Sequence, residues 1–498
     1  MSVTVTDLFC GAGGSSLGAI QAGARVVMAA NHWETAIEVH QANHPDTAHD
    51  CADISQVDPR RYPRTDVLIA SPECTNHSQA RGVSRKKQDP SLFDSPDLAA
   101  ERSRATMWDV PRFSEQMRYE AVVVENVVEA VKWVGWRAWL MAMTDMGYHH
   151  RVLSHNSMHH GVPQSRDRIY VVFWKGSKNP DLELEVDAWC PRDERWVKAR
   201  QGWKPGRSVG RYRQQWEWVC VACGAVCETV TEPAAKIIDW TLPTPRIGDR
   251  KRPLAEATRR RILAGLERFG WVPIITAGAG NGFERTPGNR ARPLTDPLPT
   301  QTATATHALG LPPDFVVTNN PNNRARAVDE ALATVTTSHN RHGLVVPLRR
   351  NGTPQLTDEP LPTVTAGGNH HGLLMRNNTG GGEMVTPVTE PARTMTAAGN
   401  QSLLVPYYGQ SQVRSVWEPI GTIPTKDKYA LLDPDQVVDD CGFRMLEPYE
   451  VAAAMAFPEN YIPRDLPKKD QVRLAGNAVT PPVMTWILGR VLQALESA

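Results

Sequence analysis

Short apolar runs alternate with amphipathic stretches over the first 170 or so residues of the chain. The apolar runs are rich in β-branched residues and have the length of buried strands; they occupy residues 3–5, 25–30, 66–70, 121–124 and 169–173. Residues 15–22, and a second stretch that ends near residue 42, have the spacing of helices. Strands that alternate with helices predict an α/β fold built on a doubly wound, mostly parallel sheet of the Rossmann-like kind.

The pattern changes after residue 176, and we expect four segments. Residues 1–180 form the N-terminal part of a catalytic domain, and residues 181–269 form a basic, tryptophan-rich insert. Residues 270–435 are rich in Thr, Pro and Asn and form a β-rich repeat array. Residues 436–498 return to the catalytic domain and end in a helix over residues 479–495.

The repeat array contains an acidic residue, usually followed by Pro, and then Thr-x-Thr. The first threonines of successive copies are about 30 residues apart, at Thr300, Thr334, Thr363, Thr394 and Thr422. Repetition at this period predicts short strands and turns, each unit burying its apolar face on its neighbours.

Bulk composition narrows the class of protein. The 498 residues are 41% hydrophobic and carry a net charge of +1, so any basic surface for nucleic acid must be local. No run of 18 apolar residues occurs, which excludes a membrane helix. Eight cysteines in so long a chain, without an export leader, favour a reducing cytoplasmic location. We expect a monomer.

Three motifs stand at the ends of predicted strands, where α/β proteins place their sites. The first is the glycine-rich stretch 7–14, which by itself is also compatible with a plain tight turn. The second is the loop 71–78 with Cys74, a candidate nucleophile or else a buried structural thiol. The third is Glu125-Asn126-Val127, a candidate acid or else a solvated carboxylate.

Together these residues resemble the DNA cytosine-5 methyltransferase family. Residues 7–14 look like its first motif, residues 72–78 its nucleophile loop, and residues 125–127 its ENV motif. Residues 161–168 are similar to its QxRxR motif, and residues 444–450 and 476–479 to its ninth and tenth motifs. The resemblance covers residues 1–180 and 436–498. The middle of the chain lies where the family has its target recognition domain.

The resemblance implies methylation of cytosine at C5 in double-stranded DNA, with the base flipped out of the duplex. Cys74 would attack C6, Glu125 would hold the base edge near N3, and Arg166 and Arg168 would orient the base. An RNA cytosine-5 methyltransferase and a catalytically silent DNA-binding module are the alternatives. The recognition sequence and a partner restriction endonuclease stay open.

The resemblance also implies S-adenosylmethionine as cofactor. The residues that would bind it are Phe9, Gly11, Ala12, Gly14, Trp33, Asp53, Ile54, Pro72, Asn477 and Val479. Three residues depart from the family pattern. Glu73 and Thr75 flank the nucleophile where Pro and Gln are usual, and His32 stands where an acidic residue normally binds the ribose.

Candidate DNA contacts lie in three places. The nucleophile loop continues into four cationic residues, which suit contacts with phosphates or else form a solvated basic loop. The predicted DNA contacts are these four residues and one residue of the QxRxR motif: Arg81, Arg85, Lys86, Lys87 and Gln164. Residues 192–213 hold eight Lys or Arg against two acidic residues, interleaved with tryptophans. The Arg and Asn residues of the array are candidates for reading base edges, although most of the Asn suit turns.

Four cysteines suggest a metal site in the insert. Cys220, Cys223 and Cys227 have knuckle-like spacing, and Cys190 could supply a fourth thiolate. We expect a structural zinc ion held by these four thiolates, the alternative being unliganded buried thiols.

Overall fold

The computed structural model describes residues 2–72, 98–177, 179–269, 273–278, 288–304, 306–312 and 438–497, with side chains of the helix after residue 98 described from residue 106 on. It also describes three pairs of two-residue strands farther along the chain. These are β17 (Phe315–Val316) with β18 (Arg326–Ala327), β19 (Val346–Pro347) with β20 (His371–Gly372), and β21 (Val405–Pro406) with β22 (Tyr429–Ala430).

A seven-stranded sheet forms the centre of the catalytic domain, in the order β3-β2-β1-β4-β5-β8-β6. Its strands are β1 (Thr4–Leu8), β2 (Arg25–Asn31), β3 (Ala48–Cys51), β4 (Val67–Ala70), β5 (Ala121–Asn126), β6 (His149–Asn156) and β8 (Asp167–Trp174). Strands β3 to β5 pair in parallel, whereas β8 runs opposite to both of its neighbours. The predicted α/β class and the mostly parallel, doubly wound sheet are confirmed.

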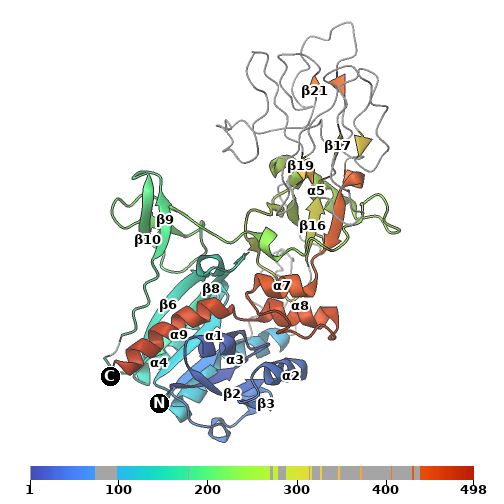
Figure 1. Cartoon of the computed structure of the whole chain (residues 1–498). Helices are drawn as coiled ribbons and strands as arrows, with labels where there is room; N and C mark the ends of the chain where they lie inside the picture. Colours follow the sequence, from blue (N-terminus) through green and yellow to red (C-terminus); the bar gives the residue numbers. More distant parts are fainter. Residues whose placement is uncertain are drawn as a thin grey trace, which may run out of the picture.

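Helices cover both faces of this sheet, which explains why its strands are apolar without alternation. On β4, Leu68 packs into the cluster with α3 (Leu98–Met117) and α4 (Trp136–Asp145), while Val67 and Ile69 face α9 (Pro481–Glu496). Helix α1 (Gly14–Gln21) lies beside α9, and α2 (Glu34–Asn43) follows β2 (Figure 1). The closing helix predicted for residues 479–495 is therefore α9.

Helices α7 (Pro448–Ala454) and α8 (Lys468–Asn477) connect the end of the chain to the glycine-rich turn. Their apolar residues share one cluster with Ala12 and with Ala36 and Val39 of α2. In the ninth motif, Arg444 donates to both carboxylate oxygens of buried Glu450, at 2.7 Å each. This ion pair fixes the entry to α7.

The tryptophan-rich insert forms a four-stranded antiparallel sheet in the order β11-β10-β9-β12. The strands are β9 (Val186–Cys190), β10 (Arg195–Trp203), β11 (Trp216–Cys220) and β12 (Glu228–Thr229). Trp216 and Trp218 are buried in its core, whereas Trp189 and Trp196 pair across the two central strands, β9 and β10, and are exposed. The tryptophans are thus divided between core and surface.

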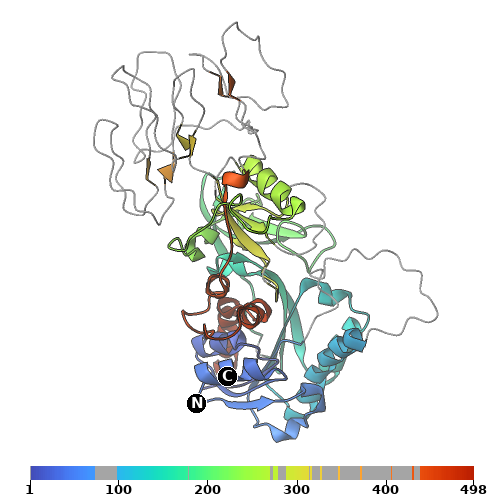
Figure 2. The same ribbon diagram turned by 90° about the vertical axis from the view of Figure 1, so that its right-hand side faces the viewer.

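A second four-stranded sheet, β14-β13-β16-β23, and the helix that packs on it combine residues that we expected in three different segments. It consists of β14 (Arg292–Pro293), β13 (Ile274–Ala277), β16 (His307–Leu311) and β23 (Gly442–Met445), and α5 (Glu256–Phe269) packs on it. Helix α5 therefore packs with the array rather than with the tryptophan-rich sheet, and the return to the catalytic domain begins after β23. This unit lies above α7 and α8 in both views (Figures 1 and 2).

The first copy of the repeat is attached to the catalytic domain. Strand β15 (Leu298–Pro299) pairs in parallel with β7 (Gln164–Ser165), and the Thr300 hydroxyl donates to the Ser165 carbonyl at 2.9 Å. Short 3-10 helices complete the described elements: η1 (Ile54–Gln56), η2 (Pro59–Arg61), η4 (Val128–Lys132), η5 (Ser157–His160) and η6 (Ala234–Ile237). Within the described ranges, every helix is too short or too polar to cross a bilayer.

Candidate active site at the carboxyl edge of the sheet

The strand register aligns the ends of four parallel strands at one edge of the sheet. Leu8 is paired with Ala70 and with Ala30, and Ala70 is paired with Val124, so these strands end in one row. The chain leaves this row through Phe9, Asn31, Ser71 and Glu125. Each of the three motifs recognised in the N-terminal part of the sequence begins within two residues of this row.

The glycine-rich turn is held in a conformation that few side chains tolerate. Phe9, Gly11 and Gly13 all have positive φ, at 60°, 55° and 91°. A Cβ on Gly11 would meet no atom within 4 Å, whereas one on Gly14 would lie 2.1 Å from the Val479 carbonyl oxygen. The turn is therefore open at Gly11 and closed by the C-terminal segment at Gly14.

A buried carboxyl group supports the turn from below. Asp7 is fully buried, and its Oδ2 accepts hydrogen bonds from the hydroxyls of Ser15 (2.6 Å) and Ser16 (2.7 Å) on the first turn of α1. Its Oδ1 is buried without a hydrogen-bond partner in the described part of the chain. Burial raises the pKa of Asp7 to about 6, although both serines act to lower it.

Histidines and a distant tyrosine complete this support, and the sequence did not reveal them. His40 bridges the Ser16 hydroxyl (2.9 Å) and His49 (2.8 Å), and burial lowers its pKa to about 3. Tyr461 donates to the Gly13 carbonyl at 3.2 Å and lies 2.6 Å from Nε2 of His44. Tyr461 and Gly13 are separated by most of the chain, so only the fold could show their contact.

Trp33, Asp53 and Ile54 lie on the neighbouring strand ends. The Trp33 backbone NH donates to the Asn31 side chain at 2.9 Å, and the Arg473 guanidinium lies 4.1 Å from the centre of the Trp33 ring. Asp53 is exposed and caps η1 by accepting from the Ser55 NH at 3.1 Å, whereas Ile54 is buried. His32, in the position that we singled out for the ribose, is exposed.

Arg112 of α3 fixes the loop that carries Asp53 and Ile54, and no sequence pattern predicted this contact. Its guanidinium donates to the carbonyls of Ile54 (2.6 Å) and Val57 (2.5 Å) and pairs with Asp109 at 2.8 Å. Asp109, which is buried, also accepts from the Ser55 hydroxyl at 2.7 Å. One helix thus holds both ends of the η1 turn.

Glu125 and Arg168 form an ion pair at the end of β5. The Arg168 Nε lies 2.9 Å from Glu125 Oε1, and the two side chains are only 16% and 11% exposed, respectively. Their strands are adjacent, because β5 pairs with β8. A partly buried, charge-assisted bond of this kind fixes the orientation of the carboxyl group.

Asn126 links the ENV motif to the start of the nucleophile loop. Its amide donates to the Pro72 carbonyl at 3.3 Å, and its Oδ1 accepts from the Val127 NH at 2.8 Å. Pro72 is buried. The remaining predicted residues of this loop lie outside the described residues: Glu73, Cys74, Thr75, Arg81, Arg85, Lys86 and Lys87.

Arg166 joins three segments that are remote in sequence. Its guanidinium donates to the carbonyls of Gln301 (3.1 Å), in the first repeat copy, and Ala478 (3.2 Å), in the tenth motif. It is 3% exposed, and burial, together with nearby Arg168, lowers its pKa to about 9. In this arrangement the Arg166 guanidinium is directed at protein carbonyls and joins these segments.

Gln164, which we predicted as a DNA contact, is fully buried beneath β15. Both side-chain amide atoms lack a hydrogen-bond partner within the described residues. Its side chain is therefore inaccessible to a ligand in this structure, in which the first repeat copy pairs with its strand. At the other end of the site, Asn477 is exposed at the last residue of α8, and Val479 is buried against α1.

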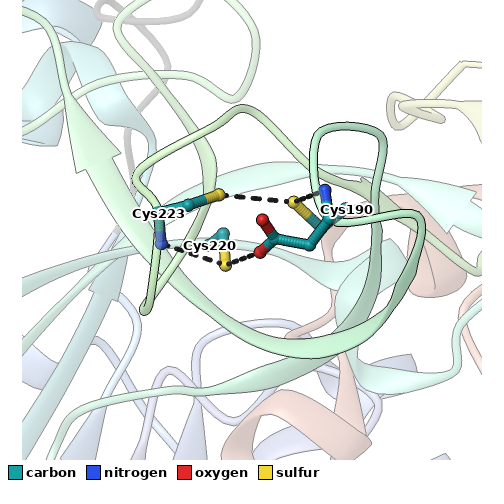
Figure 3. Close-up of side chains that lie close together, drawn as sticks. Cys190, Cys220 and Cys223 are labelled. Carbon is teal, nitrogen blue, oxygen red and sulfur yellow. Dashed lines mark hydrogen bonds between the residues drawn. The ribbon is translucent and has the colours of Figure 1, made fainter.

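The structure groups three of the four predicted metal-binding cysteines. Cys190, Cys220 and Cys223 lie close together in the tryptophan-rich sheet (Figure 3), and the fourth residue of the group is Asp193. Cys227 is buried nearby, but its thiol donates to the Ala225 carbonyl at 3.4 Å. The group that converges in the structure thus contains three sulfurs and a carboxylate oxygen, and the fourth predicted cysteine lies beside Cys190.

Comparison with known proteins agrees with the motifs. Residues 3–200 match the family model described as C-5 cytosine-specific DNA methylase. The type II methyltransferase M.HhaI of Haemophilus parahaemolyticus is 30% identical over 186 residues, which is 35% of this chain and 49% of that protein. M.AgeI of Thalassovita gelatinovora is 29% identical over 181 residues, 33% of this chain and 38% of that protein. The chain thus spans less than half the length of these curated relatives.

Among solved structures, Entamoeba histolytica EhMeth covers 99% of both chains with a TM-score of 0.47 and 10% identity. A putative DNA modification methyltransferase from an Escherichia coli prophage covers 42% of this chain and 62% of its own, with a TM-score of 0.29 and 22% identity. Residues 3–200 are therefore similar to the C-5 cytosine-specific DNA methylase family, and the strands that carry the motifs of this region end at one edge of the sheet.

Proposed function

We propose that the chain transfers a methyl group from S-adenosylmethionine to carbon 5 of cytosine in double-stranded DNA. The observation that carries this proposal is the Glu125–Arg168 pair, held at 2.9 Å at the strand end next to the start of the Cys74 loop, within the region that matches the family model. M.HhaI and M.AgeI, named as type II methyltransferases, support DNA as the substrate.

The residues at the strand ends fit the cofactor. Gly11 leaves open space where a side chain would stand, and the glycine-rich turn precedes the N-terminus of α1. Phe9, Gly11, Trp33, Asp53 and Ile54 would line the binding site, with Ala12, Gly14, Pro72, Asn477 and Val479 around it. When bound, S-adenosylmethionine supplies an electrophilic methyl group on a sulfonium.

The chain's own residues would activate the base. The Cys74 thiolate would add to C6 of the cytosine, which turns the ring into an enamine that is nucleophilic at C5. Glu125 would bind the base at N3 and stabilise the charge that develops there. After the methyl group has reached C5, loss of the C5 proton to a base and elimination of the thiolate restore the aromatic ring and free Cys74.

Arg168 and Arg166 would have separate tasks. Arg168 keeps the Glu125 carboxyl in one orientation, so that it need not reorganise when the base arrives. Arg166 anchors the first repeat copy and the tenth motif to the same strand end. C6 is inaccessible within a duplex, so the base must leave the stack at a cost of about a few kcal/mol.

DNA would lie between the catalytic edge and the inserted sheets. Arg81, Arg85, Lys86 and Lys87 would contact phosphates, and the repeat array would carry the residues that read the sequence. Since the first copy is anchored at Ser165 and Arg166, deletion of a later copy, for example residues 334–362, should change the methylated sequence while activity persists. If the methylated sequence stayed the same, the array would serve as scaffold only.

Transfer of radioactive methyl groups from S-adenosylmethionine tests the substrate. The full chain is incubated with duplex DNA and, in parallel, with tRNA, and bisulfite sequencing locates the product. Methylation of duplex DNA at C5 is expected. Label confined to tRNA would establish the RNA enzyme instead, and label in neither would overturn the proposal.

Trapping tests the nucleophile. DNA that contains 5-fluorocytosine should form a covalent adduct with the chain, because fluorine cannot leave C5 as a proton does. Cys74→Ser should abolish the adduct, whereas Cys51→Ser, at an exposed thiol at the end of β3, should retain it. An adduct that survives Cys74→Ser would refute the assigned nucleophile.

A further inference from the structure

Four potential metal ligands converge at one end of the tryptophan-rich sheet. The thiols of Cys190, Cys220 and Cys223 and a carboxylate oxygen of Asp193 all lie within 4.8 Å of one another. The three sulfurs point toward one another from two separate loops (Figure 3). None of the three cysteines forms a disulfide.

The two loops that supply these ligands have the same local geometry. In the first, the Asp193 NH donates to the Cys190 sulfur at 3.4 Å; in the second, the Cys223 NH donates to the Cys220 sulfur at 3.5 Å. Each turn thus presents two ligands three positions apart, with a backbone NH directed at the first sulfur. Such NH groups stabilise a thiolate, which is the form that binds metal.

The residue that follows each pair of ligands also has the same backbone conformation in the two turns. Glu194 follows Asp193 with φ 49°, and Gly224 follows Cys223 with φ 70°. A left-handed backbone conformation is unusual for a glutamate. Glu194 adopts it at the position that Gly224 occupies in the other turn. The first turn is therefore built like the second, with an aspartate in place of the last cysteine.

The separations suit a tetrahedral ion. With bonds of about 2.3 Å, the ligands of a tetrahedral zinc ion are about 3.8 Å apart. Here the sulfurs of Cys190 and Cys223 are 3.5 Å apart, and the Cys220 sulfur lies 3.4 Å from Oδ2 of Asp193. These two separations differ from the tetrahedral value by a few tenths of an ångström, and all the others are below 4.8 Å.

We propose that Cys190, Asp193, Cys220 and Cys223 bind one structural zinc ion. Three thiolates select a soft or borderline metal over magnesium or calcium. Four protein ligands leave no open coordination position, so the ion has no part in methyl transfer. It joins the β9–β10 turn to the end of β11, and Arg192, which donates to the Cys223 carbonyl at 3.0 Å, ties the same two segments.

Cys227 provides the matched control. It is as buried as Cys220, at 2% exposure each, and its thiol lies beside that of Cys190, but it is not one of the four residues whose ligand atoms all lie within 4.8 Å of one another. Its backbone NH donates to the Trp218 carbonyl at 2.8 Å, which keeps it in the strand connection after the second turn. A site that used four cysteines would need Cys227, whereas the proposed site does not.

Metal analysis of the purified full chain tests the proposal without reference to activity. Elemental analysis should find one zinc ion per chain in the wild type and in Cys227→Ser. Cys220→Ser and Asp193→Ala should lose at least about tenfold in zinc affinity. Cobalt substitution then counts the sulfurs, because the thiolate-to-cobalt absorption grows with each thiolate.

Asp193→Cys keeps four ligands and therefore tests the site even if the variants that lose a ligand do not fold. It should retain one metal ion per chain and show a cobalt–thiolate band about one third stronger, since four thiolates replace three. Zinc lost in Cys227→Ser but retained in Asp193→Ala would overturn the ligand set. A wild-type chain that binds no zinc at micromolar concentrations under reducing conditions would overturn the site.

Discussion

Replacement of Asp7 by Asn removes a buried charge while keeping an oxygen for the two serine hydroxyls. The carboxyl group is fully buried, and its pKa is raised from 3.8 to about 6. The folded state therefore binds the proton more tightly than the unfolded state. Protonation of Asp7 therefore stabilises the folded state. This stabilisation is complete below about pH 4 and is lost as the pH rises through about 6.

The size of the effect follows from these two pKa values. The full shift corresponds to about 3 kcal/mol, at 1.36 kcal/mol for each pKa unit. Between about pH 5 and about pH 8 the wild type should lose about 1.4 kcal/mol of unfolding free energy that Asp7→Asn keeps. The amide is neutral throughout this range, so the difference between the two proteins isolates Asp7.

Urea unfolding followed by circular dichroism, at several pH values, measures this difference. Ser15→Ala is the companion variant: it removes a hydrogen bond that lowers the pKa of Asp7, so the loss of stability should extend to higher pH. A stability difference between wild type and Asp7→Asn that is independent of pH would refute the raised pKa. A Ser15→Ala profile shifted to lower pH would refute the role of the serine.

Three further changes test the site. Gly14→Ala places a Cβ 2.1 Å from a backbone oxygen of the C-terminal segment and should destabilise the chain by about 1–3 kcal/mol, measured by urea unfolding; an unchanged midpoint would contradict the contact. Arg112→Met, which releases the Ile54 carbonyl, should weaken S-adenosylmethionine binding about tenfold in calorimetry while DNA affinity stays the same. Arg168→Lys removes the directed bond to Glu125 and should lower kcat by about tenfold or more with little change in KM for DNA; an equal rise in KM would indicate a binding role instead.

The sequence determined the class of fold and the order of the motifs. Apolar runs without alternation, each followed by a helix or a glycine-rich turn, are sufficient to predict a sheet covered on both faces, because such strands must be buried on both sides. The runs predicted at residues 25–30 and 121–124 became β2 and β5. The motifs that follow the strands could be located because their spacing is local.

Only the tertiary structure decided which distant residues complete the site. Tyr461 lies beneath the glycine-rich turn, Arg112 holds the η1 loop, and Arg166 bridges the first repeat copy to the tenth motif. None of these contacts has a sequence signal, because each depends on how helices pack after the strands have paired.

The same limit explains the two places where sequence reasoning and the fold differ. Gln164 is a polar residue that the sequence alone gives no reason to place in the interior. In the fold it is fully buried in β7, which pairs in parallel with β15. Cys227 has the spacing of a ligand, but the group of converging ligand atoms includes Asp193, thirty or so residues upstream, because antiparallel pairing brings the β9–β10 turn beside the end of β11. Local pattern identifies which residues are chemically able to act; strand register determines which of them meet.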